Sequence, residues 1–154
     1  MNLRFDHYVV TLPTNNYLSI FELVKHKGNR DYYHQLQSRE LYEAYKKAVW
    51  GGTGSIKDIF RRVIDTPTSR FFVTEERASI VISAMLKGKP QNKLSPTRKE
   101  MYEEIFRRVK AMMRVKPDSS LSDILRIVLA QPAPRFYITA GSAQVLIHRI
   151  KKDR

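Results

Sequence analysis

An internal repeat limits what this chain can fold into. Residues 55–85 read SIKDIFRRVIDTPTSRFFVTEERASIVISAM, and residues 120–150 read SLSDILRIVLAQPAPRFYITAGSAQVLIHRI. The two segments align without a gap at an offset of 65 residues, and 11 of the 31 positions are identical. Most of the other apolar positions exchange only for another apolar residue. Such a repeat indicates one structural unit that is built twice.

Each unit is expected to begin with its own helix upstream of the repeat. Residues 39–43 (RELYE) match residues 99–103 (KEMYE) at an offset of 60. The apolar residues that follow recur at the spacing of one helix face, which predicts that this face is buried. They are Leu41, Tyr45, Ala48 and Val49 in one copy and Met101, Ile105, Val109, Met112 and Met113 in the other.

A second helix is expected after Ser55 and after Ser120. Each serine has an aspartate three residues later, a variant of the capping box that satisfies free amides at a helix start. Pro67 and Pro132 should end these helices, because the residue before a proline avoids helical angles. The predicted core positions are Ile56, Ile59, Phe60, Val63 and Ile64, matched by Leu121, Ile124, Leu125, Val128 and Leu129.

Residues 70–74 (RFFVT) and 135–139 (RFYIT) are aromatic and β-branched, which favours short strands. Thr74 and Thr139 can cap a third helix in each unit, with Ala78, Val81, Ile82 and Met85 as its core positions in the first copy. We expect the two strands to pair antiparallel about a pseudo-twofold axis, with residues 5–12 as a third strand.

The predicted fold class is therefore mainly α, a tandem duplication of a helix–helix–short strand–helix unit with a minor antiparallel β element. We expect residues 1–154 to form a single compact domain, with repeat units at 38–88 and 97–151 and a basic linker at 89–96. The N-terminal segment 1–37 is a candidate for an eroded third copy. Five of its apolar and aromatic residues match the first unit at an offset of 39: Ile20, Phe21, Val24, Tyr32 and Tyr33 align with Ile59, Phe60, Val63, Phe71 and Phe72.

The composition argues against several classes of function. The chain has no cysteine, which excludes disulfides, thiolate nucleophiles and cysteine-based metal sites. Its four histidines have no metal-ligand spacing, and the glycines at 51–54 lack the lysine of a nucleotide-binding loop. We therefore expect no enzyme activity, no cofactor and no metal.

No segment approaches the roughly 20 apolar residues that span a bilayer, and the first residues do not resemble a secretory signal. The expected setting is cytoplasmic, with no membrane contact.

Arg70 and Arg135 recur beside aromatic residues in both copies. An arginine in this setting can bind phosphate or stack on a base. It can equally bind helix carbonyls or pack its stem on Phe71 or Phe136, and retention in both copies favours that structural role.

The strongest functional signal is the charge, which is +13 overall and uneven. Residues 87–116 contain ten basic and three acidic residues, a net charge of +7. Such a field attracts polyanions, nucleic acid above all. The predicted nucleic-acid-binding residues are Lys87, Lys89, Lys93, Arg98, Lys99, Arg107, Arg108, Lys110, Arg114 and Lys116.

We expect this basic band to contact mainly the phosphate backbone. The long stretch from Pro67 to Thr74 rules out a helix-turn-helix, whose helices are joined by a short turn. Two alternatives stay open. The band can be merely a solubilising surface, or the chain can be a protein–protein interaction module that docks an acidic partner or itself, using Trp50, Tyr42 or Met112–Met113. The sequence favours neither DNA nor RNA, neither single nor double strands, and no particular oligomeric state.

Overall fold

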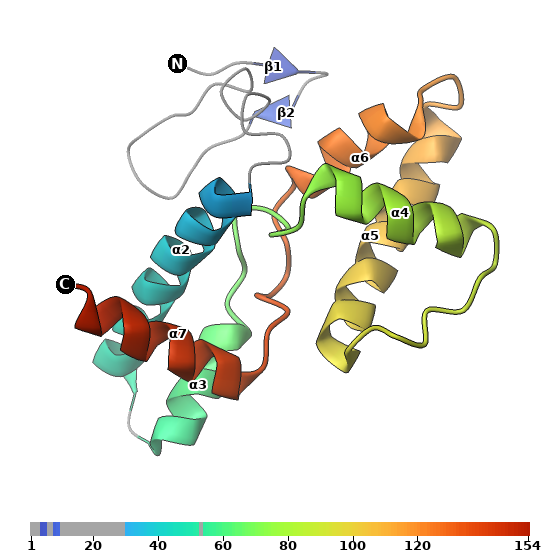
Figure 1. The fold of residues 1–154 in the computed structure, drawn as a ribbon. Helices are drawn as coiled ribbons and strands as arrows, with labels where there is room; N and C mark the ends of the chain where they lie inside the picture. The colour runs from blue at the N-terminus through green and yellow to red at the C-terminus, as the bar shows by residue number, and fades with distance from the viewer. Residues whose placement is uncertain (1–3, 6–7, 10–29, 53) are drawn as a thin grey trace.

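The computed structural model describes residues 4–5, 8–9, 30–52 and 54–154, and the fold of this part of the chain is all-α apart from one minimal strand pair. Strands β1 (Arg4–Phe5) and β2 (Tyr8–Val9) form a two-residue antiparallel ladder. The helices are α2 (Arg30–Gly51), α3 (Ile56–Ile64), α4 (Glu75–Leu86), α5 (Pro96–Val115), α6 (Leu121–Leu129) and α7 (Ala140–Lys152) (Figure 1).

The helices pack in two groups of three, and each group takes its third helix from the other repeat unit. Helices α2 and α3 of the first unit pack with α7 of the second, while α5 and α6 pack with α4 of the first unit (Figure 1). Each group has its own apolar core. Ile147 of α7 lies in the core with Leu41 and Phe60, whereas Ile82 of α4 lies with Ile105 and Leu125.

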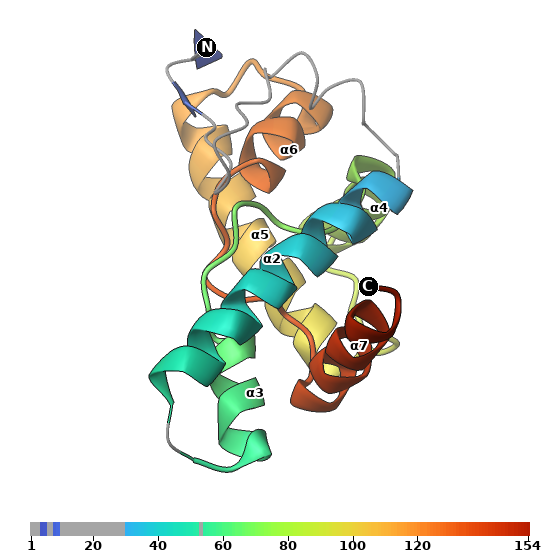
Figure 2. The same ribbon diagram turned by 90° about the vertical axis from the view of Figure 1, so that its left-hand side faces the viewer.

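The exchange is made by two connectors, residues 65–74 and 130–139, that run side by side between the groups (Figures 1 and 2). Thr68 and Ala133, which are equivalent positions, exchange both backbone hydrogen bonds, at 2.9 and 3.1 Å. Further along, the Phe71 N–H donates to the Leu129 carbonyl at 3.1 Å and the equivalent Phe136 N–H donates to the Ile64 carbonyl at 3.0 Å. Each hydrogen bond that the first connector donates to the second unit thus has an equivalent bond that the second connector donates to the first unit.

The predicted strands at 70–74 and 135–139 are wrong. The amides of Phe71 and Phe136 bind the last carbonyls of α6 and α3, groups that have no partner within their own helices. Tyr137 also has a φ of 56°, in the left-handed region, which interrupts an extended run. The antiparallel element between the connectors is the single Thr68–Ala133 bridge. Of the predicted strand at 5–12, the described residues Phe5, Tyr8 and Val9 belong to β1 and β2, which pair with each other.

The predicted helix starts are confirmed. Ser55 accepts the Asp58 N–H and Ser120 accepts the Asp123 N–H, and Thr74 and Thr139 cap α4 and α7 in the same way. Most predicted core positions are buried, including Val63, Val109 and Val128. Several others are half-buried and pack against the cores: Tyr45, Ala48, Ile59, Ile64, Met85, Met112 and Leu121. Val49, Ile56 and Met113 are exposed, because each lies in the first or last turn of its helix.

The predicted boundary between residues 37 and 38 falls inside α2, which already begins at Arg30. Tyr32 and Tyr33 are helical, unlike Phe71 and Phe72, with which the third-copy hypothesis aligned them. The other three residues of that alignment, Ile20, Phe21 and Val24, lie outside the described residues, as do residues 10–12.

Arg70 and Arg135 both make contacts within the protein. Arg70 is 7% exposed, its guanidinium lies 4.1 Å from the centre of the Tyr33 ring, and its Nε donates to the Phe71 carbonyl at 3.0 Å. Arg135 pairs with Asp65 at 2.8 Å and with Glu100 at 3.4 Å. These contacts attach the connectors to the helices, in agreement with the structural alternative.

Glu40 attaches the first connector to α2. Its carboxylate accepts the backbone N–H and the hydroxyl of Ser69, both at 2.8 Å. Burial raises the pKa of Glu40 above its ordinary value of 4.5, although these bonds act in the opposite direction.

The exchanged helices predict how the matched core substitutions Ile82→Ala and Ile147→Ala differ. Each should cost about 2–5 kcal/mol, because each leaves a cavity in a buried core. We expect Ile82→Ala to increase amide hydrogen exchange mainly in α5 and α6, and Ile147→Ala mainly in α2 and α3. Loss of protection mainly in the other two helices of the substituted residue's own unit would contradict the exchange.

Glu40 predicts a pH dependence. Because its pKa is higher in the folded state than in the unfolded state, the folded protein binds more protons between the two values, and stability decreases as pH rises through this window. Glu40→Gln removes this contribution. The free energy of unfolding of Glu40→Gln relative to wild type should therefore increase from pH 4 towards pH 7 in urea titrations. A constant difference would show that Glu40 does not titrate in this way.

Candidate nucleic-acid interface

Most of the basic band lies on α5, whose position follows from local sequence. Ser95 takes the N-cap position and Pro96 the first turn, where its missing N–H costs nothing. Met101, Ile105 and Val109 then repeat every four residues and bury one face against α4 and α6. The opposite face of α5 remains exposed.

Four predicted residues share this outer face, which we call the outer stripe: Lys99, Arg107, Lys110 and Arg114. Their spacing places them within about 80° around the helix axis and along about 22 Å of its length. All four are exposed. Glu103, also exposed, lies between the first two and is the acidic residue that interrupts the outer stripe.

Arg107 is partly neutralised by Glu104. Its Nη2 lies 2.6 Å from the carboxylate, and the hydrogen bond from Arg107 is the main reason why the pKa of Glu104 is lowered. Lys99, Lys110 and Arg114 differ, since none of them forms an ion pair with a carboxylate of the described residues. These three are the cations of the outer stripe that remain available to an outside anion.

Arg108 was predicted as a binding residue, but the structure places it among internal contacts. Its side chain is 22% exposed and its Nε lies 2.8 Å from Glu104. Its Nη1 donates to the Pro132 carbonyl at 2.9 Å, and its guanidinium lies 5.0 Å from the centre of the Phe71 ring. Arg108 therefore joins α5 to both connectors.

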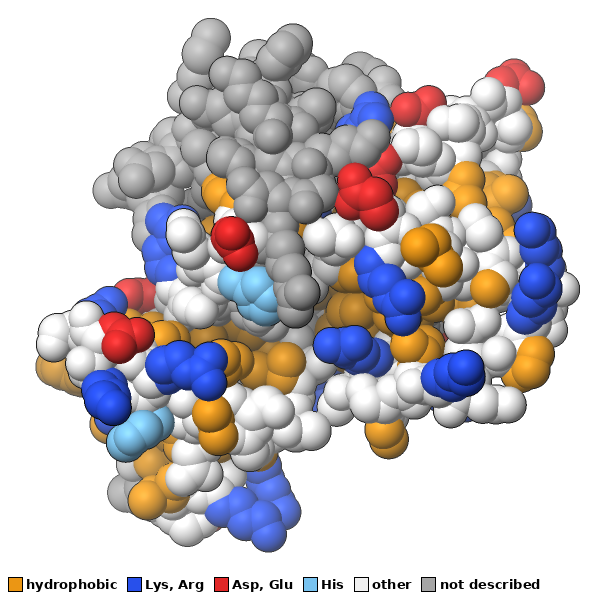
Figure 3. Space-filling model, in the orientation of Figure 1, with side chains coloured by type: hydrophobic (Ala, Val, Ile, Leu, Met, Phe, Trp, Pro, Cys, Tyr) orange, Lys and Arg blue, Asp and Glu red, His pale blue; other side chains and the backbone are white. Residues whose placement is uncertain are grey.

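The linker brings further cations to α5. Gly88 ends α4 with a φ of 74°, and the Gly88 and Lys89 amides donate to the carbonyls of Met85 and Ala84 at 2.9 and 3.0 Å. Lys87, Lys89 and Lys93 are exposed in the segment between α4 and α5, residues 87–95, which is the linker of the structure and begins two residues before the predicted one. Lys89 then lines a hollow of about 310 Å³ together with Lys99. On the face seen in Figure 3, blue side chains without red ones gather at the lower right, over this linker.

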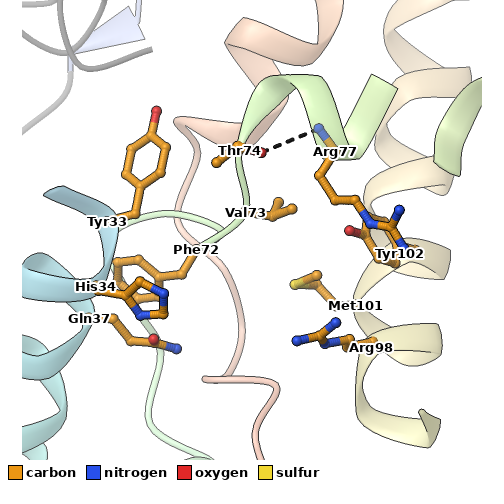
Figure 4. A pocket seen from close by; sticks show the side chains of 10 residues that line it. All are labelled: Tyr33, His34, Gln37, Phe72, Val73, Thr74, Arg77, Arg98, Met101 and Tyr102. Atoms are coloured by element: carbon orange, nitrogen blue, oxygen red, sulfur yellow. Dashed lines mark hydrogen bonds between the residues drawn. The ribbon is translucent and has the colours of Figure 1, made fainter. Parts of the chain in front are cut away.

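The ends of the band behave differently. Lys116 caps the C-terminus of α5, where its N–H donates to the Met112 carbonyl at 2.8 Å. Arg98 lies on the core-facing side of α5 and lines a pocket of about 400 Å³ (Figure 4). The ten predicted residues thus do not form one surface. The structure brings together the outer stripe and the linker lysines, and it separates Arg98 and Arg108 from them.

Sequence reasoning missed Arg77, which lines the same pocket as Arg98 from the first turn of α4. It also missed that Arg98 belongs to the core-facing side, although its position three residues before Met101 and seven before Ile105 is a signal of this.

The described residues contain no cluster of three or more histidine or acidic side chains able to hold a metal ion. None of the helices in this part of the chain is long and apolar enough to cross a membrane. Comparison with models of known families, with curated proteins and with solved structures gives no match.

Two neighbouring residues of α5 offer a matched test of these assignments. Arg108→Gln should lower the free energy of unfolding by about 1–3 kcal/mol, because it removes the charged donor of the Pro132 carbonyl and one of the two arginines that pair with Glu104. Lys110→Gln removes an exposed charge and should change stability by less than about 0.5 kcal/mol. Urea denaturation of both variants measures this, and equal stability of the two would contradict the internal role of Arg108.

Proposed function

We propose that this protein is a non-enzymatic nucleic-acid-binding protein that acts mainly through contacts with the phosphate backbone. The observation that carries the proposal is the line of exposed cations on the outer stripe, continued by Lys87, Lys89 and Lys93 on the linker. Three of the stripe residues have no carboxylate partner among the described residues.

Phosphate contacts suit this geometry. Lysine and arginine side chains spread along about 22 Å of helix can each meet a different phosphate, and neutralising phosphates releases counterions. No motif that reads base edges accompanies the outer stripe, so binding should depend little on sequence.

The two repeat units resemble each other in their backbone hydrogen bonds as well as in sequence. We infer that the two units are copies related by a pseudo-twofold axis that passes near the Thr68–Ala133 bridge. The support is that Phe71 and Phe136, equivalent in the repeat, donate to Leu129 and Ile64, which are also equivalent. We further propose that the N-terminal segment 1–37 belongs to the same domain.

The binding test uses a triple variant of the outer stripe, Lys99→Gln, Lys110→Gln and Arg114→Gln. It leaves Arg107 and Arg108 intact, so the contacts of Glu104 and the connectors are preserved. We expect weaker binding to all nucleic-acid sequences. The slope of log affinity against log salt should become flatter by roughly 0.9 for each phosphate of duplex DNA that the variant no longer neutralises. Fluorescence anisotropy with labelled duplex and single-stranded oligonucleotides, at several salt concentrations, measures both effects.

The control variant removes three charges from the other helix group: Lys57→Gln, Arg149→Gln and Lys152→Gln, all exposed residues. It should bind nearly as well as wild type. An equal loss in both variants would show that net charge alone attracts the nucleic acid. Absence of wild-type binding at micromolar protein and low salt would end the proposal.

A second candidate function is a protein–protein interaction module that docks an acidic partner or a second copy. Trp50 favours it, since this large side chain at the end of α2 is 91% exposed and lies close in sequence to the exposed Val49 and Ile56. Light scattering after size-exclusion chromatography tests self-association. A concentration-independent monomer would remove that version.

A further inference from the structure

The pocket that contains Arg98 lies where the two helix groups meet. One wall comes from α2 and the first connector, and the other comes from the starts of α4 and α5 (Figure 4). Its volume is about 400 Å³, and it is lined by residues of both groups.

Among the described residues, the lining contains two arginines and a histidine but no carboxylate. Neither Arg77 nor Arg98 forms an ion pair with a carboxylate of the described residues. Both arginines lie near one buried group: burial raises the pKa of the Tyr102 hydroxyl, and the charges of Arg77 and Arg98 oppose this. Two guanidinium groups thus line one pocket, and no carboxylate of the described lining residues accompanies them.

Such a pair favours an anion. Two like charges near one cavity repel each other, and an anion between them relieves this repulsion and gains charge-assisted hydrogen bonds. Arginine suits phosphate in particular, because its planar donors match the phosphate oxygens two at a time. Gln37 and Thr74, on other sides of the pocket, are further polar side chains.

The pocket also has an aromatic side. Figure 4 shows His34 and Phe72 opposite Arg98, whose guanidinium points towards them across the pocket. Phe72 is stacked on Phe136 at 6.4 Å between ring centres, which fixes its orientation. A flat ring attached to the phosphate can pack on this side, because aromatic faces bind any base without hydrogen-bond readout.

We propose that this pocket binds a nucleotide phosphate, with Arg77 and Arg98 on the phosphate and the His34–Phe72 side next to the base. The nucleotide is either a free mononucleotide or one unit of a strand. The site is separate from the outer stripe, so it does not depend on the function proposed above.

Isothermal titration calorimetry with adenosine monophosphate, adenosine and inorganic phosphate tests the site. We expect the monophosphate to bind more tightly than either of the other two, since each lacks one half of the ligand. Arg98→Gln should weaken binding about tenfold or more, which is typical of losing one charged hydrogen-bond partner. The control with Lys57→Gln, Arg149→Gln and Lys152→Gln should leave it unchanged. NMR signals of the His34 ring should shift during the titration with wild type.

Arg98→Gln is preferred as the main variant because Arg77 also supports Tyr102, and Arg77→Gln can disturb folding. Thermal denaturation identifies any such effect. A labelled 5′-phosphorylated oligonucleotide distinguishes the two sources of the phosphate. If Arg98→Gln weakens its binding more than the triple Lys57, Arg149 and Lys152 control does, the pocket takes a unit of a strand. If Arg98→Gln weakens only the binding of adenosine monophosphate, the ligand is a free nucleotide. The proposal is overturned if Arg98→Gln weakens the binding of neither adenosine monophosphate nor the oligonucleotide, or if the wild-type protein binds neither of them at millimolar concentration.

Discussion

The hydrogen bonds between the two connectors determine the rest of this structure. Thr68 and Ala133 bind each other, and Phe71 and Phe136 each donate to the last carbonyl of a helix in the other unit. These bonds direct each chain segment across to the opposite group, so that α4 completes the core around α5 and α6 while α7 completes the core around α2 and α3. Neither unit has a complete core without the other. The two groups must consequently form together, although their apolar cores are separate.

The same exchange determines which surfaces are exposed. Helix α5 packs with α4 and α6, and these neighbours cover only the side that carries Met101, Ile105 and Val109. Since α4 must then return to the start of α5, the linker with its lysines passes beside the first turns of that helix and lines a hollow with Lys99. The meeting of α2 with the starts of α4 and α5 forms the pocket with Arg77 and Arg98. Both candidate sites thus follow from the crossing of the connectors.

Local features of this fold were predictable from the sequence, and features that depend on distant segments were not. The serine and threonine caps and the apolar faces of the helices require only neighbouring residues, and they were predicted correctly apart from the terminal turns. The short aromatic runs were assigned to strands because their side chains suit strands. Their Phe71 and Phe136 amides instead donate to unpaired helix carbonyls that lie 58 and 72 residues away in the chain, and the sequence does not indicate these partners. Similarly, Arg108 looks like any basic residue of the band until its contacts with Pro132 and Phe71 are known.

Comparison of the two first helices separates the inherited part of the outer stripe from the part that is particular to α5. At the offset of 60, Lys99, Glu103 and Arg107 correspond to Arg39, Glu43 and Lys47, so a basic–acidic–basic pattern occurs on both helices. A duplicated surface explains this shared pattern without any ligand. It does not explain the next positions, because Lys110 corresponds to Trp50 and Arg114 lies beyond the point where α2 ends at Gly51. Of the three lysines between α4 and α5, Lys87 and Lys89 correspond to Lys152 and Arg154 at the offset of 65, and Lys93 has no counterpart. The excess positive charge on α5 therefore comes from Lys110 and Arg114, which the shared scaffold does not require. This is the reason to look for the nucleic-acid contacts at these two residues and at Lys93.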